Sequence, residues 1–190
     1  MSSNGHSHHR SEYLRTLRQS RRFLDKPVPQ DIIDDLLVVA RATGQDENAG
    51  AWQFLVIDDI VTRNALSHAG SLTEFLASVS VVIVLVVEGD AAPSKASIEA
   101  RIADRIMRAA GGHGLGSGTG WFGTDEAQEA VGDILGIRSG RQAVWAVGIG
   151  YIDESGSDTS SLESVRQTLD RLASRARPVE PKGDEPDSMG

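Results

Sequence analysis

The strongest constraint on the fold is a run of aliphatic residues at positions 79–87, which reads VSVVIVLVV. Valine and isoleucine favour a strand, and the lack of apolar–polar alternation indicates a strand that is buried on both faces. The run has about half of the ~20 residues that a helix needs to cross a bilayer. It therefore predicts the central strand of a layered domain rather than a membrane anchor.

Segments of helical and strand type surround this central run. The clearest helix is expected at residues 30–42, where apolar residues recur at helical spacing opposite Asp31, Asp34 and Asp35. Thr124 is the expected N-cap of another helix. The expected helices are 11–20, 30–42, 60–68, 94–111, 124–135 and 162–176, and the expected strands are 52–57, 79–87 and 143–152. Several helices and few apolar strands predict an α+β sandwich around a small central sheet.

Charge and composition narrow the classes of partner. The chain has 190 residues with a net charge of −8, which argues against nucleic acid and anionic membranes as partners. The absence of cysteine excludes disulfides and thiolate chemistry. Residues 1–10 lack the apolar core of a secretory signal, so we expect a cytoplasmic protein with a disordered leader. We expect one domain at residues 11–153, and a C-terminal extension at 154–190 that is partly helical and then mobile.

A cluster of cations stands out against this acidic background. Arg18, Arg21, Arg22 and Lys26 fall within nine residues, just before a Pro-Val-Pro turn. Guanidinium groups gathered in this way are suited to hold a phosphate or an electron-rich ring. The alternative is a solvated basic face that pairs with nearby carboxylates. If the first helix extends through residue 21, Arg18 and Arg21 share one face.

Three further features have a functional and a structural interpretation. The glycine-rich run at 111–120 is a flexible loop, or a turn whose backbone N–H groups approach a flat ligand. Trp52 and Trp121 wall an aromatic site or belong to the core. We expect His113 to be structural or solvated, since no second histidine lies near it at ligand spacing. No metal-ligand cluster and no Ser-His-Asp order stands out.

Four segments in order resemble the FMN-dependent nitroreductase family between about Tyr13 and Ile152. The family's R-S-x-R-x-[FY] element is matched by Arg18, Arg21 and Phe23, with Gln19 in place of serine. Its N-x-Q-P-W element is matched by Asn48 and Trp52, with Gly50 and Ala51 as departures. A G-L-G-[SA] helix end is matched at 114–117, followed by a tryptophan at 121. A final L-G-I and a strand ending in G-Y are matched at 135–137 and 150–151.

The resemblance implies a nitroreductase-like sandwich with a mostly antiparallel central sheet, a homodimer, and FMN bound between subunits. In family terms the arginines contact the phosphate, the ribityl chain or the pyrimidine edge, Asn48 contacts the flavin, and residues 119–121 lie near its reactive nitrogen. A basic residue near the C-terminus, Arg175 or Arg177, completes the phosphate site. The cofactor-binding residues expected from the resemblance are Arg18, Gln19, Ser20, Arg21, Asn48, Gly118, Thr119, Gly120, Trp121 and Arg177.

The implied activity is a ping-pong oxidoreductase reaction. NAD(P)H reduces FMN, and a nitroaromatic, quinone or similar small acceptor then takes the electrons, so the protein needs no catalytic acid, base or nucleophile. The departures at Leu17, Gln19, Gly50 and Ala51 leave open a flavin-binding or storage protein of the same fold without efficient turnover. A related flavin chemistry also fits these motifs, and so does an interaction module whose basic patch docks an acidic partner.

Overall fold

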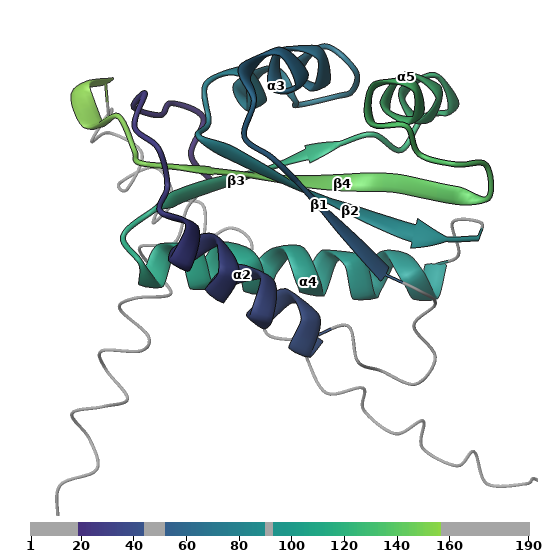
Figure 1. The fold of residues 1–190 in the computed structure, drawn as a ribbon, viewed down its shortest axis with the longest axis horizontal. Coiled ribbons are helices and arrows are strands. Elements are labelled where there is room, and N and C mark those ends of the chain that lie inside the picture. Colours follow the sequence, from purple (N-terminus) through teal and green to yellow (C-terminus); the bar gives the residue numbers. More distant parts are fainter. Residues whose placement is uncertain (1–18, 44–51, 90–92, 157–190) are drawn as a thin grey trace, which may run out of the picture. The chain divides into compact units, whose positions relative to one another are not determined.

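The computed structural model describes residues 19–43, 52–89 and 93–156. Within them, four α-helices flank one four-stranded sheet (Figure 1). The helices are α2 (Gln30–Thr43), α3 (Ile60–Ser67), α4 (Pro93–Gly112) and α5 (Asp125–Leu135), with short 3₁₀ helices η1 (Glu74–Ala77) and η2 (Glu154–Gly156). The strands are β1 (Trp52–Ile57), β2 (Val81–Glu88), β3 (Gly116–Trp121) and β4 (Arg141–Gly150). The predicted α+β class is confirmed.

The sheet has the strand order β1-β2-β4-β3, and every neighbouring pair is antiparallel. Helices α2 and α4 cover one face, whereas α3 and α5 cover the other (Figure 1). The two inner strands, β2 and β4, are therefore enclosed, and β1 and β3 form the edges.

Strand β2 contributes to two separate cores, as its sequence predicts. Val81, Ile83 and Leu85 pack with the α2 and α4 side, whereas the alternate residues, among them Val82 and Val84, pack with the α3, η1 and α5 side. All seven residues from Val81 to Val87 are at most 2 % exposed. A strand that supplies both cores cannot alternate polar and apolar side chains, which explains the unbroken aliphatic run.

The ends of the helices on the α3 and α5 side are set by local chemistry. The Asp59 side chain accepts a hydrogen bond from the backbone N–H of Thr62 and caps α3. Thr124 caps α5 by accepting from the N–H of Ala127, which confirms the predicted cap, and Gly136 ends the helix in the left-handed conformation.

Two expectations about local structure are wrong. The glycine-rich run is not wholly a loop, because its second half forms the edge strand β3. The first predicted helix does not include its last two residues, because Gln19 forms a bridge to Ser117 and Ser20 is also non-helical. The rest of that predicted helix lies outside the described residues, as do the leader and the predicted helix at 162–176. No helix among the described residues is long and apolar enough to cross a membrane.

Candidate functional site

The segment that follows residue 18 lies along the outer edge of β3. Gln19 forms a parallel bridge with Ser117, and the N–H of Ser20 donates to the carbonyl of Ser117 at 2.7 Å. Farther along, Phe23 bridges Ile152. This pairing brings together residues that sequence analysis placed in one site although about a hundred positions separate them.

Arg21 is the centre of this arrangement. Its Nη1 donates to the carbonyl of Thr119 at 3.0 Å and to that of Leu72 at 3.4 Å, and its Nη2 donates to Oε1 of Gln19 at 2.8 Å. An arginine side chain carries five N–H donors. The guanidinium is therefore fixed in direction, and Nε–H and one Nη2–H have no partner among the described residues.

The guanidinium of Arg21 also lies against an aromatic platform. Its central carbon is 4.2 Å from the ring centroid of Phe75, a cation–π distance. Burial lowers the pKa of Arg21, and the carboxylate of Glu74 opposes that shift. Because the ordinary pKa of a guanidinium lies far above neutral pH, Arg21 is a permanent cation. Glu74 places a negative charge close to it.

Gln19 accepts hydrogen bonds from both Arg21 and Thr119, the two residues that join the N-terminal segment to β3. Its Oε1 accepts from Nη2 of Arg21, from the N–H of Thr119 at 3.4 Å and from Oγ1 of Thr119 at 3.3 Å. The edge of β3 pairs with Gln19 at Ser117 and with Ser71 at Trp121. Thr119 lies between these two bridges, and the side chains of Gln19 and Arg21 take the place of a missing strand there.

Glycine at position 118 makes this close packing possible. A methyl group on Gly118 would lie 2.7 Å from the carbonyl oxygen of Ser20, 3.0 Å from the Phe75 ring and 3.2 Å from Nη1 of Arg21. Gly148, opposite Gly118 on β4, has the same relation to Phe75, because its methyl group would approach that ring to 2.7 Å. The two glycines thus leave room for the platform under Arg21.

Leu72 provides a second unusual feature at the site. It has a φ of 59°, the left-handed region that non-glycine residues avoid. Its carbonyl accepts from Arg21, yet the residue as a whole is 66 % exposed. Strained backbone of this kind concentrates at ligand-binding sites. Leu72 also adds an exposed apolar surface close to the fixed guanidinium.

The remaining predicted residues are distributed differently. Gly120 faces Thr73 and Leu76 of the neighbouring η1 segment, and Trp121 bridges Ser71 through its backbone. Arg18, Asn48 and Arg177 lie outside the described residues. Within one chain, Trp52 and Trp121 lie on opposite edge strands of the sheet, β1 and β3, so they do not wall one site together there.

His113 has the structural role expected for it. Its Nε2 lies 2.8 Å from Oδ2 of Asp35, so it links the end of α4 to α2. Among the described residues, no group of three or more histidines and carboxylates is placed to hold a metal ion.

Sequence reasoning missed three members of the site: Leu72, Glu74 and Phe75. They lie in and just before η1, a segment that has no motif and no periodic pattern. Their role depends on tertiary contact with Arg21, and the local sequence carries no signal of that contact.

Solved structures share this fold. No family model matches the sequence, and no curated protein matches it significantly. An FMN-dependent nitroreductase from Clostridium difficile R20291 aligns with a TM-score of 0.69 at 23 % identity, covering 81 % of this chain and 95 % of that one. Nitroreductase A from Vibrio parahaemolyticus aligns with a TM-score of 0.67 at 14 % identity, covering 85 % and 83 %.

A further solved structure is an NADPH:FMN oxidoreductase from Vibrio harveyi in complex with NAD⁺. It aligns with a TM-score of 0.67 at 15 % identity and covers 85 % of this chain and 84 % of that one. The chain therefore has the nitroreductase fold, and the resemblance drawn from its motifs is confirmed at that level.

Proposed function

We propose that the protein is an FMN-dependent oxidoreductase that uses NAD(P)H to reduce nitroaromatic, quinone or similar small acceptors. The observation that carries the proposal is Arg21, a permanent cation fixed against β3 with two N–H donors left for a ligand. The fold shared with flavin oxidoreductases supports the same class of activity.

The residues present fit a flavin at this position. The unpartnered donors of Arg21 suit a phosphate oxygen or the oxygen and nitrogen acceptors of a pyrimidine edge. A fixed cation beside that edge favours the extra negative charge of the reduced ring. The exposed side chain of Leu72 offers apolar contact to a flat ligand. When bound, FMN would supply the redox chemistry, taking a hydride from NAD(P)H and passing electrons to the acceptor in a separate half-reaction.

The proposed site includes three residues from outside the described part of the chain. Arg18 and Arg177 would add positive charge for the phosphate, and Asn48 would add hydrogen bonds to the ring. A homodimer in which each copy completes the other's site is part of the same proposal. Ser20, Gly118, Gly120 and Trp121 would define the edge of the site through their backbone.

A flavin-binding protein without efficient turnover is the second candidate. The observation that favours it is that Arg21 already has partners within the protein. Three of its N–H groups donate to Thr119, Leu72 and Gln19, and the carboxylate of Glu74 offsets its charge. Both effects weaken the stabilisation of an anionic reduced flavin.

One pair of variants tests binding. The full chain is incubated with FMN, and the Kd is measured by quenching of flavin fluorescence. Arg21→Gln is expected to weaken binding by at least about tenfold, because hydrogen bonds to a charged group contribute about 1.5–3 kcal/mol. The matched control is Arg22→Gln. Arg22 forms an ion pair with Asp153, with 3.6 Å between Nη2 and Oδ2, and its side chain makes no hydrogen bond with Arg21 within the described part of the chain. Equal affinity of the two variants, or no FMN uptake by the parent protein, contradicts the proposal.

A second measurement separates turnover from storage. The reconstituted protein is mixed rapidly with NADH or NADPH, and the flavin absorbance is followed. Bleaching within the time of catalytic turnover, followed by recovery on addition of a quinone, supports the oxidoreductase. Tight FMN binding with no bleaching by either donor supports the storage protein.

A further inference from the structure

A second candidate binding site lies at the opposite end of the sheet from Arg21. A cleft of about 520 Å³ opens between β1 and the turn that joins α5 to β4. Arg141 is at the first position of β4, whereas Thr119 pairs with Val147 of the same strand. Six residues of strand separate those positions, a distance of about 20 Å. The cleft therefore lies well away from Arg21 and Thr119 of the same chain.

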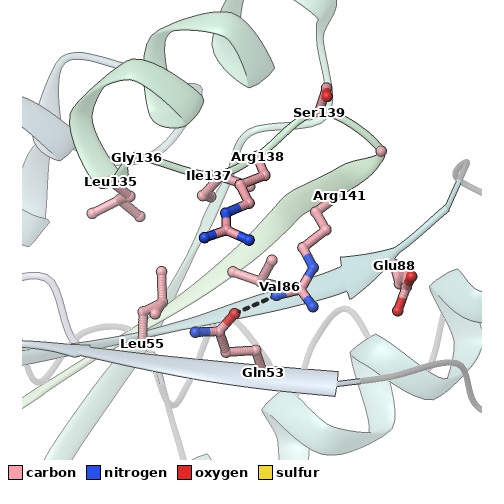
Figure 2. Close-up of a pocket in the computed structure, with 11 residues that line it drawn as sticks. Gln53, Leu55, Val86, Glu88, Leu135, Gly136, Ile137, Arg138, Ser139 and Arg141 are labelled. Carbon is pink, nitrogen blue, oxygen red and sulfur yellow. Dashed lines mark hydrogen bonds between the residues drawn. The ribbon is translucent and has the colours of Figure 1, made fainter.

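Two arginines point into this cleft. Figure 2 shows the guanidinium groups of Arg138 and Arg141 directed into the space above β1 and β2. Arg141 is held by Gln53, whose Oε1 accepts a hydrogen bond from Nη1 at 2.7 Å. The Arg138 guanidinium has no hydrogen-bond or ion-pair partner among the described residues. The site thus combines one oriented cation with one cation that is free to meet a ligand.

The backbone that carries both arginines is held in place by specific contacts. Gly136 and Gly140 adopt positive φ angles of 63° and 84°, and they bend the chain back toward β4. The N–H of Ile137 donates to the carbonyl of Gly132 at 3.0 Å, and the N–H of Gly89 donates to the carbonyl of Gly140 at 2.7 Å. These bonds tie the turn to α5 and to the end of β2, so the positions of the arginines are preorganised.

Four aliphatic side chains form the apolar part of a lining that is otherwise polar. Leu55 comes from β1, Val86 from β2, and Leu135 and Ile137 from the end of α5 and the turn (Figure 2). Small-molecule sites combine such apolar linings with a few polar groups, and they occupy about 300–1,000 Å³. The volume of this cleft lies within that range, and its lining is more polar than that of most such sites.

The charge of the cleft has the opposite sign to that of the whole chain. Of the residues that line it, Arg138 and Arg141 are cationic and Glu88 is anionic, whereas the chain carries a net charge of −8. Glu88 lies opposite Arg141 in the register of β2 and β4 and offsets one of the two positive charges, so the lining keeps a net positive charge. An anionic group bound between the two arginines offsets the remaining charge and gains charge-assisted hydrogen bonds.

We infer that this cleft binds a small organic anion with a flat apolar body, of the class of aromatic carboxylates. The carboxylate lies between the guanidinium groups of Arg138 and Arg141, and the ring packs against the half-buried side chains of Leu55 and Ile137. Arginine forks match a carboxylate in geometry as well as charge. The ligand has both an anionic group and an apolar body because the lining contains both cationic and aliphatic side chains.

Calorimetric titration of the full chain, loaded with FMN, with naphthalene carboxylate tests the inference. We expect saturable one-to-one binding, and no binding of the neutral naphthalene methanol of nearly the same shape. Arg138→Gln and Arg141→Gln are each expected to weaken binding by at least about tenfold. The matched control is Arg105→Gln on α4, an exposed arginine on the other side of the sheet, and it is expected to bind like the parent.

Three outcomes would overturn the inference. They are the absence of saturable binding, equal binding of the carboxylate and the alcohol, and equal affinity of the Arg138 and Arg105 variants. Arg138→Gln changes a side chain that makes no hydrogen bond or ion pair within the described residues, and its thermal unfolding checks that the fold is intact. FMN binding is measured on the same variants and is expected to be unchanged. Because naphthalene carboxylate is also titrated into flavin-free protein, failure of the flavin proposal does not decide this test.

Discussion

Arg21 donates a hydrogen bond to the carbonyl of Thr119 with an N···O distance of 3.0 Å, although 98 positions separate the two residues in the sequence. This contact joins the segment that precedes α2 to the edge strand β3. It also fixes the direction of the cation that we propose to face the flavin. The packing and charges around this contact, together with one helix cap, can be tested by substitution.

Gly118→Ala is expected to destabilise the protein by about 1–3 kcal/mol, because the added methyl group overlaps the carbonyl of Ser20 and the ring of Phe75. The free energy of unfolding is measured by urea titration. Gly132→Ala in α5 is the matched control, since nothing lies within 4 Å of its added methyl group. That control is expected to stabilise the helix by about 0.5–1 kcal/mol. A parent-like midpoint for Gly118→Ala would show that the glycine is not needed for packing.

Gln19→Ala is expected to weaken FMN binding through the position of Arg21. The variant removes the acceptor that holds Nη2 of Arg21 and the peptide of Thr119. We expect an affinity loss of about threefold to tenfold and a stability loss of about 0.5–1.5 kcal/mol. Gln30→Ala is the control, because the side chain of Gln30 donates to Asp34 on the surface of α2. If both variants bind FMN equally well, Gln19 does not position the cation.

Glu74→Gln is expected to tighten FMN binding. The carboxylate of Glu74 interacts with Arg21 and opposes an anionic ligand there. At an exposed site the gain is about twofold to fivefold, measured by fluorescence titration at low salt. The gain is expected to shrink at about 1 M salt, where the screening length falls to about 3 Å. Glu129→Gln on α5 removes an equal charge elsewhere and is expected to leave the Kd unchanged.

Asp59→Ala is expected to lower the melting temperature at pH 7, and the difference from the parent protein is expected to vanish in acid. The hydrogen bond from Thr62 lowers the pKa of Asp59 below its ordinary value of 3.8. A lowered folded-state pKa means that the cap contributes fully above the unfolded value and is lost as the pH falls through the folded value. Thermal unfolding at pH 7 and at successive values below 3.8 checks this. A constant difference across that range would show that the carboxylate charge has no part in the cap.

The sequence predicts well those elements whose pattern is local. The unbroken aliphatic run of β2 identifies a strand buried on both faces, and Thr124 identifies the start of α5. In both cases the signal lies within the element itself. The order of the family motifs predicted the fold, and it also grouped Gln19 and Arg21 with residues 118–121 of β3. The periodicity of the sequence indicates neither.

The strand β3 could not be predicted from its own residues. Three of its six positions are glycine, which disfavours a strand by propensity. The strand forms because β4 pairs with it. Its glycines are explained by close packing, since a side chain at position 118 would overlap the ring of Phe75. The extended conformation of Gln19 has the same origin, since its partner Ser117 is remote in sequence. Non-local pairing decided both elements.

The placement of Gln19, Ser20 and Arg21 along β3 has a consequence for the behaviour of shortened chains. An uncovered outer strand offers its amide and carbonyl groups as a template for self-association. A chain that begins after Phe23 would lose Gln19, Ser20 and Arg21, the partners of Ser117 and Thr119. Such a chain is expected to precipitate by strand-to-strand stacking, so this segment also serves as a guard against aggregation.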